Sequence, residues 1–210
     1  STPTALRPWV LSGKSSSAMQ AQAARLARSV DCQTRDMNAI AYSLAATRTT
    51  FNHRAAVIPT PGVDVAEALT ALAAGHEHAA VVTGTVNRTA KTAFLFAGQG
   101  TQHVGMGTRL YEEFPVFASA LDAVCAELDP LLHFPLRQLM FDGPIDELRQ
   151  TRAAQPAIFA FEIALYRLWE SWGARPDFVA GHSVGEIAAA HIAGILDLAS
   201  ATRLIAARAH

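Results

Sequence analysis

Residues 179–194, VAGHSVGEIAAAHIAG, decide how this chain is interpreted, because a short apolar strand runs into Gly-His-Ser-Val-Gly at 181–185. The pattern Gly-x-Ser-x-Gly is typical of a nucleophile elbow, a sharp strand-to-helix turn that presents a serine hydroxyl above the sheet. The residues two before and two after the serine approach closely, so both must lack side chains, and Gly181 and Gly185 meet this demand. The small residues at 187–190 predict a helix packed tightly against the strand.

Ser183 is therefore the candidate nucleophile. The N-terminus of the following helix places backbone N–H groups and the positive end of the helix dipole beside its hydroxyl. The N–H of Val184 is a candidate donor to the oxyanion that forms during acyl transfer. The alternative is an ordinary glycine-rich turn with a capping serine.

A second glycine-rich loop, Gly98-Gln99-Gly100, follows an apolar strand predicted at 92–97. Acyl transfer needs two N–H donors aimed at the oxyanion, and the N–H of Gln99 is the candidate for the second. A phosphate-binding turn is the alternative. It is disfavoured because His103 stands where the pattern Gly-x-Gly-x-x-Gly requires its last glycine.

Helical periodicity predicts further helices at about 114–128, 145–151 and 156–172. In the last of these, Pro156 fits the first turn. One apolar stripe on this helix is expected to be buried, with Glu162 facing outward. The stripe consists of Ile158, Phe161, Leu165, Trp169 and Trp172.

Residues 1–89 predict a separate small α/β unit in the order β-α-α-β-α-β, followed by a second unit at 90–210. The first unit shows no cluster of catalytic residue types, so a linker or adaptor is the favoured interpretation. Its expected strands lie at about 8–12, 54–58 and 78–86, and its expected helices at about 15–30, 37–47 and 63–74.

Composition limits the classes of function. Half of the 210 residues are hydrophobic and 17% are charged, which excludes a disordered chain. A formal net charge of −1 gives no electrostatic footprint for nucleic acid or an anionic membrane, and no apolar run approaches the ~20 residues that span a bilayer. Cys32 and Cys125 lie far apart without metal-ligand partners, so we expect no disulfide framework, no metal site and a cytoplasmic location.

Four stretches make the chain similar to a known family. They are 8–14 (PWVLSGK), 94–107 (FLFAGQGTQHVGMG), 155–157 (QPA) and 179–194. The chain resembles the acyltransferase domain of modular (type I) polyketide synthases, which is related to malonyl-CoA:acyl carrier protein transacylases. The resemblance covers essentially the whole chain, although Ala97 stands where the family usually has proline. It implies a ketosynthase-to-acyltransferase linker domain at 1–89 and the N-terminal part of an α/β-hydrolase-like acyltransferase large subdomain at 90–210.

The resemblance also assigns roles to residues. Ser183 matches the acylated nucleophile, and the backbone N–H groups of Gln99 and Val184 match the oxyanion hole. Arg208 matches the arginine that pairs with the free carboxylate of a malonyl-type acyl group. Arginine suits this task because its planar fork of donors holds a carboxylate at two points. From the sequence alone, a surface charge on a helix is the alternative interpretation of Arg208.

Gln155 matches a family glutamine near the acyl group. His182 is counted with the substrate-binding residues, and its ring is expected to point away from the Ser183 hydroxyl. A serine nucleophile needs a general base, but none of the eight histidines can be placed beside it from the sequence. His103 is the first candidate within the chain, whereas the resemblance implies a catalytic histidine beyond His210.

The function implied by the resemblance is transfer of an extender acyl group from CoA to the phosphopantetheine thiol of an acyl carrier protein. It proceeds through an acyl-serine, in polyketide or related fatty acid biosynthesis, without a metal or bound cofactor. The partners are the carrier protein, the ketosynthase and other domains of the same synthase. Val184 is more typical of members that select malonyl groups. A serine hydrolase or thioesterase with the same elbow, and a non-catalytic fragment, are the alternatives.

The end of the sequence predicts a continuation. A helical pattern at 198–208 is not stopped by glycine or proline. Only two strands are predicted between Lys91 and His210, too few for a doubly wound sheet. We therefore interpret the chain as the first half of an acyltransferase.

Overall fold

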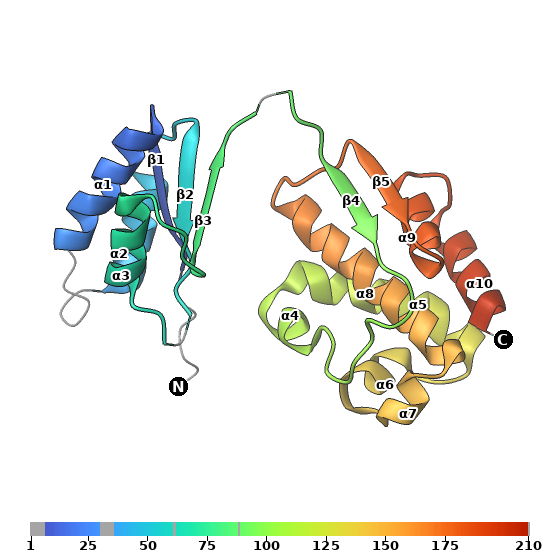
Figure 1. The fold of residues 1–210 in the computed structure, drawn as a ribbon. Coiled ribbons are helices and arrows are strands. Elements are labelled where there is room, and N and C mark those ends of the chain that lie inside the picture. The colour runs from blue at the N-terminus through green and yellow to red at the C-terminus, as the bar shows by residue number, and fades with distance from the viewer. Residues whose placement is uncertain (1–6, 30–35, 61, 88, 210) are drawn as a thin grey trace. The chain divides into compact units, whose positions relative to one another are not determined.

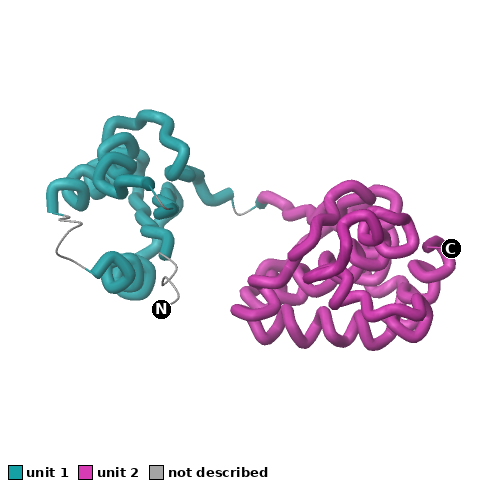
Figure 2. The backbone as a smooth tube through the Cα atoms, turned by 90° about the horizontal axis from the view of Figure 1, so that it is seen from below, with its two compact units in different colours: residues 1–89 teal, residues 90–210 magenta. Residues whose placement is uncertain are grey.

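The computed structural model describes the chain in four stretches, residues 7–29, 36–60, 62–87 and 89–209. The chain divides into two compact units, residues 1–89 and 90–210, shown in different colours in Figure 2. Each unit has its own hydrophobic core. Two features of the sequence analysis, the helix end at Val30 and Cys32, lie outside the described residues.

The first unit is a three-stranded antiparallel sheet in the order β1-β2-β3, and its helices cover one face (Figure 1). Leu11 lies opposite Ala55, which in turn lies opposite Thr83. The predicted element order is confirmed. The elements are β1 (Trp9–Gly13), α1 (Ser16–Ser29), α2 (Met37–Ala46), β2 (His53–Val57), α3 (Val65–Ala74) and β3 (Val81–Thr85).

Local signals explain where these elements begin and end. The Asp64 carboxylate caps α3 by accepting hydrogen bonds from the N–H groups of Ala66 and Glu67, and Gly75 ends the helix in the left-handed conformation at φ 73°. The inward face of the sheet buries alternate residues, including Trp9 and Leu11, against the helices.

The second unit is built around a parallel pair of strands, β4 and β5, with Phe96 opposite Gly181. Parallel neighbours need a crossover connection, and five helices, α4 to α8, supply it. Helices α4 and α6 were not predicted from the sequence, and they are only six and seven residues long. The elements are β4 (Ala93–Phe96), α4 (Thr108–Glu113), α5 (Pro115–Leu132), α6 (Leu136–Asp142), α7 (Ile145–Leu148), α8 (Thr151–Ser171), β5 (Phe178–Gly181), α9 (Val184–Ile192) and α10 (Leu198–Ala209).

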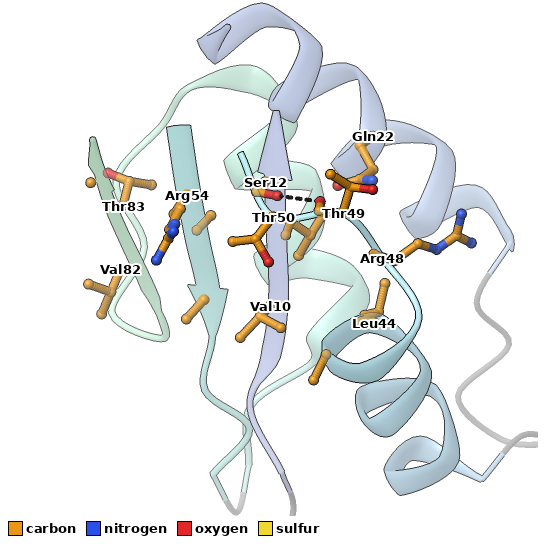
Figure 3. Close-up of a pocket in the computed structure, with 15 residues that line it drawn as sticks. Val10, Ser12, Gln22, Leu44, Arg48, Thr49, Thr50, Arg54, Val82 and Thr83 are labelled. Atoms are coloured by element: carbon orange, nitrogen blue, oxygen red, sulfur yellow. Dashed lines mark hydrogen bonds between the residues drawn. The ribbon is translucent and has the colours of Figure 1, made fainter. Parts of the chain in front are cut away.

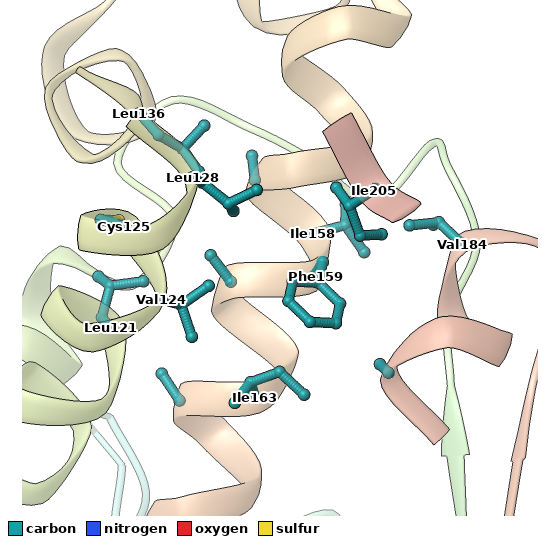
Figure 4. Packing of buried hydrophobic residues seen from close by; sticks show 14 of the residues in the cluster. Leu121, Val124, Cys125, Leu128, Leu136, Ile158, Phe159, Ile163, Val184 and Ile205 are labelled. Atoms are coloured by element: carbon teal, nitrogen blue, oxygen red, sulfur yellow. The ribbon is translucent and has the colours of Figure 1, made fainter. Parts of the chain in front are cut away.

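Helix α8 lies at the centre of this unit and packs against α5, α9 and α10 (Figure 1). Figure 4 shows the resulting core, in which Phe159 of α8 lies between Val124 of α5 and Ile205 of α10. All three side chains are buried. The core therefore packs α8 against α9 and α10, the two helices that follow the elbow.

The predicted start of the long helix is wrong. Helix α8 begins at Thr151, so Pro156 lies inside it and not in its first turn. Proline lacks an N–H group and removes the bond to the carbonyl four residues earlier, which here is that of Arg152. The carbonyl of Arg152 therefore lacks its usual intrahelical donor, but α8 continues to Ser171.

The predicted buried stripe is also partly wrong. Trp169 and Trp172 are 46% and 56% exposed, and Glu162, expected outside, is partly buried. The side of α8 that packs on the other helices carries Ile163 and Leu168. The predicted stripe instead follows the side that, together with β4, lines an apolar groove of about 770 Å³. Its lining includes Phe94, Ile158, Phe161, Leu165 and Trp169.

Candidate active site

The turn between β5 and α9 holds Ser183 in a strained backbone conformation. Its φ of 56° and ψ of −112° are values that residues with a side chain rarely adopt. Ser183 occupies the N-cap position of α9, yet its hydroxyl makes no capping hydrogen bond there. Val184, the first residue of the helix, has a backbone N–H without an intrahelical acceptor. The turn thus presents a hydroxyl and a backbone donor side by side.

Glycine is required on both sides of the turn. A Cβ atom at Gly181 would lie 2.1 Å from the carbonyl carbon of Gly185. A Cβ atom at Gly185 would lie 2.4 Å from the carbonyl oxygen of Phe96 in β4. Both contacts are with backbone atoms, which cannot move aside as a flexible side chain can. The two glycines therefore allow the strand, the turn and α9 to pack at these distances.

The loop Gly98-Gln99-Gly100 packs directly on the elbow. The backbone N–H of His182 donates to the carbonyl of Phe96 over 3.0 Å. A Cβ atom at Gly98 would lie 2.4 Å from Nδ1 of His182, so the imidazole ring rests against the loop. The two glycine-rich segments that the sequence analysis singled out thus lie side by side.

Two distant side chains complete the cluster. Nη2 of Arg208, on α10, donates a hydrogen bond to Oγ of Ser183 over 3.2 Å. Nε2 of Gln155, on α8, lies 3.5 Å from Oε1 of Gln99, at the outer limit of a hydrogen bond. Gln155 is only 8% exposed, and its Oε1 has no partner within the described part of the chain. The structure therefore brings a guanidinium to the Ser183 hydroxyl and an amide to the glycine-rich loop beside the elbow.

Comparison with known proteins places the second unit in a family. Residues 93–210 match the family model described as acyl transferase domain. The chain belongs to the acyl transferase domain family. In the first unit, residues 8–72 match a second model, described as CurL-like, PKS C-terminal.

Relatives extend the likeness of this acyl transferase chain to both units. The mycoketide-CoA synthase of Mycobacterium tuberculosis is 48% identical over 96% of the chain, which spans 5% of that synthase. The solved acyltransferase domain from module 8 of the salinomycin polyketide synthase is 34% identical, with a TM-score of 0.82 over 97% of this chain and 49% of its own length. A malonyl-transacylase solved with a type II polyketide synthase acyl carrier protein is 37% identical, with a TM-score of 0.51 over 57% of this chain and 38% of its own.

These relatives confirm the predicted fold class, and the chain spans about half the length of the solved domain.

Three histidines of the second unit contact groups other than the Ser183 hydroxyl. His182 packs on Gly98, as described above. Nδ1 of His191 lies 2.9 Å from the carbonyl oxygen of Leu196, and Nδ1 of His103 lies 3.3 Å from that of Thr101. Among the described residues, no histidine forms a hydrogen bond with the nucleophile candidate.

Sequence reasoning missed one titratable group close to the loop. Oε1 of Glu162, on α8, accepts a hydrogen bond from the N–H of Ala97 over 2.5 Å. Burial raises the pKa of this carboxyl to about 7, against the lowering effect of that hydrogen bond. The sequence did contain a signal for this role. Glu162 stands in an apolar segment seven positions after Gln155, and that spacing places both residues on the same face of a helix.

The described residues contain no group of three or more His, Cys, Asp or Glu side chains placed to hold a metal ion. Cys125 is buried in the core, and this burial raises the pKa of its thiol to about 12, so it is not a nucleophile at neutral pH. Within the same stretches, no helix combines the length and the apolar character needed to cross a bilayer.

The first unit holds a hollow of about 420 Å³ on the outward face of its sheet, shown in Figure 3. Its one serine, Ser12, donates to the carbonyl of Thr49 and accepts from the N–H of Phe51. The hydroxyl thus holds the loop after α2 in place, and no histidine lines the hollow. The candidate chemistry lies in the second unit.

Proposed function

We propose that this chain forms part of an enzyme that transfers a malonyl-type acyl group from CoA to the phosphopantetheine thiol of an acyl carrier protein. The observation that carries the proposal is the contact of 3.2 Å between Arg208 and the hydroxyl of Ser183, which sits on a strained turn. This pairing sets a carboxylate-binding group beside a nucleophile. It suits an acyl group that ends in a carboxylate.

In the first half-reaction, Oγ of Ser183 attacks the thioester carbonyl and gives its proton to a general base. The N–H groups of Gln99 and Val184 donate to the oxyanion of the tetrahedral intermediate. The intermediate then collapses by breaking the carbon–sulfur bond. CoA leaves as a thiol after taking the proton back, and the acyl group remains as an ester of Ser183.

In the second half-reaction, the carrier thiol gives its proton to the same base and attacks the acyl-Ser183 ester. The ester bond breaks, and Ser183 recovers the proton as the acyl group moves to sulfur. Throughout both steps, the guanidinium of Arg208 pairs with the free carboxylate of the acyl group. By the resemblance, Val184 is more typical of members that transfer malonyl than of those that transfer methylmalonyl.

The remaining parts of the proposal rest on the resemblance. It assigns the base to a histidine of the C-terminal half of the domain and requires no bound cofactor. It assigns residues 1–89 to the linker between a ketosynthase and the acyltransferase, and the ketosynthase and other synthase domains are further partners. The match to a solved complex of a malonyl-transacylase with a carrier protein supports the acceptor. The cytoplasmic location remains a prediction.

The test compares transfer with hydrolysis in a complete domain. Here a complete domain means this chain continued by a C-terminal half, either its own or, as a chimera, that of a solved relative. The domain is mixed with radiolabelled malonyl-CoA, with and without carrier protein bearing phosphopantetheine. We expect label on the carrier to accumulate well above free malonate. Free malonate as the main product, with or without the carrier, would contradict the proposal and identify a hydrolase.

A further inference from the structure

Glu162 is an acidic residue with apolar surroundings. It lies on α8 between Phe161 and Ile163 and lines the apolar groove beside β4. Its Oε1 accepts the backbone N–H of Ala97 over 2.5 Å, while its Oε2 is buried without a hydrogen-bond partner among the described residues. The described residues offer this carboxyl no ion pair. Its one bond is to the backbone at the start of the Gly98-Gln99-Gly100 loop.

The hydrogen bond from Ala97 to Glu162 restrains the backbone that leads into the Gly98-Gln99-Gly100 loop. Ala97 is the last residue before two glycines in three positions, a segment with wide conformational freedom. The carbonyl oxygen of Ala97 would lie 2.7 Å from a Cβ atom at Gly185, so Ala97 also touches the elbow. Fixing its N–H therefore fixes the backbone that leads from the elbow contact to the N–H of Gln99.

A second contact from the same helix supports this arrangement. Gln155 lies seven residues before Glu162, which is two turns away on the same face of α8. It reaches the side chain of Gln99, so α8 contacts the loop at both Ala97 and Gln99. A helix packed in the core thus contacts the glycine-rich loop at two positions, in addition to the contacts that the loop makes with the elbow.

We propose that Glu162 is a positioning residue for acyl transfer, which fixes the Gly98-Gln99-Gly100 backbone by accepting the N–H of Ala97 and so aims the N–H of Gln99 at the oxyanion. This inference rests on the proposed function of the loop as half of the oxyanion hole. Small displacements of such donors are costly, because a misplacement of about 1 Å can lower a rate about 100-fold.

The electrostatics of the site agree with such a role. Burial raises the pKa of Glu162 to about 7, and perturbed acids of this kind gather at functional sites. The other titratable side chains lining the same groove are His103, from the loop, and Tyr166, from α8. Ionised Glu162 accepts the N–H of Ala97 more strongly than the neutral acid, since charge-assisted hydrogen bonds are the stronger kind.

The first test uses three variants of the complete domain. Glu162→Leu removes the acceptor, Glu162→Gln keeps it without charge, and Glu170→Gln alters an acid of the same helix that pairs with Arg167. We expect Glu162→Leu to lower kcat for Ser183 acylation by about 10- to 100-fold with KM for malonyl-CoA within about twofold. Glu162→Gln should restore kcat to within about threefold of wild type, and Glu170→Gln should match wild type.

Provided that the wild-type domain is acylated, two outcomes would overturn the proposal. One is a kcat for Glu162→Leu within about twofold of wild type. The other is an equal loss in Glu162→Gln and Glu162→Leu, because an accepted hydrogen bond would then not be what matters. Absence of acylation in the wild type itself would instead refute the proposed function of the domain.

A second measurement needs no variant and no activity. In the wild-type complete domain, NMR follows the carboxyl carbon of Glu162 and the amide proton of Ala97 against pH. We expect the amide proton to shift with the same midpoint as the carboxyl carbon. An Ala97 amide that does not follow the titration of Glu162 would overturn the proposal even if Glu162→Leu failed to fold.

Discussion

The strain at Ser183 predicts that glycine is more stabilising than alanine at this position. Backbone conformations of this kind cost a residue with a side chain about 1–3 kcal/mol, and glycine escapes that cost. Against this, glycine loses about 0.5–1 kcal/mol more conformational free energy on folding than alanine. Both variants remove the same hydroxyl and its contact with Arg208, so that loss cancels. Ser183→Gly should therefore be more stable than Ser183→Ala by about 1 kcal/mol.

The assay is urea unfolding of the chain, followed by the fluorescence of Trp169 and Trp172 in the second unit. Trp9 is replaced by Phe in all samples so that the first unit does not contribute. Its indole N–H is buried without a hydrogen-bond partner, so the replacement leaves no polar group unpaired. With a slope of about 1–3 kcal/mol per M urea, a difference of about 1 kcal/mol shifts the midpoint by roughly 0.3–1 M.

Ser200, in the first turn of α10, provides the matched control. There the same pair of substitutions should give the opposite order, with glycine about 1 kcal/mol less stable than alanine, because the backbone is helical. If Ser183→Gly were less stable than Ser183→Ala, as at Ser200, the turn would store no strain. The geometric argument for an elbow would then lose its basis.

Three further predictions follow from the same geometry. Arg208→Ala in the complete domain should lower transfer from malonyl-CoA about 10- to 100-fold more than transfer from acetyl-CoA, because only the malonyl group has a free carboxylate that pairs with arginine. Equal losses for the two substrates would make Arg208 structural. Gly185→Ala should lower the free energy of unfolding by about 3 kcal/mol, because its Cβ meets backbone, whereas Gly84→Ala has open space and should change it by less than about 1 kcal/mol; similar values in urea titrations would contradict the close packing. Because burial raises the pKa of Glu162 from 4.5 to about 7, the folded state holds its proton more tightly, and the free energy of unfolding should fall by about 3 kcal/mol as pH rises through this range. Glu162→Gln should remove most of that fall, and a variant as pH-dependent as wild type would place the effect on another group.

The elbow could be predicted from the sequence because its constraints are local. A strand, a turn with two glycines and a small-residue helix stand within sixteen consecutive residues, and each demand can be checked at a known position. The contact between Arg208 and Ser183 is different in kind. It depends on how α10 packs against α8 and α9, and only the resemblance to a family indicated it.

The errors in the predicted stripe of α8 have a common physical cause. Periodicity identifies an apolar stripe but does not say what the stripe packs against. Helix α8 has two apolar sides, one against other helices and one along the groove, so Trp169 is partly exposed and Glu162 is partly buried. A carboxyl is buried where a hydrogen-bond donor is available to it. The donor to Glu162 is the N–H of Ala97, and the sequence does not indicate that these two residues are close.

The most direct test of the account is to trap the acyl-enzyme. The complete domain is mixed with malonyl-CoA in the absence of carrier protein, quenched in acid, digested and analysed by mass spectrometry. The account predicts a malonyl ester on Ser183, discharged when carrier protein is added before the quench, and no modification in a folded Ser183→Ala variant. Malonylation of another residue, or transfer to the carrier at wild-type rate by Ser183→Ala, would contradict it.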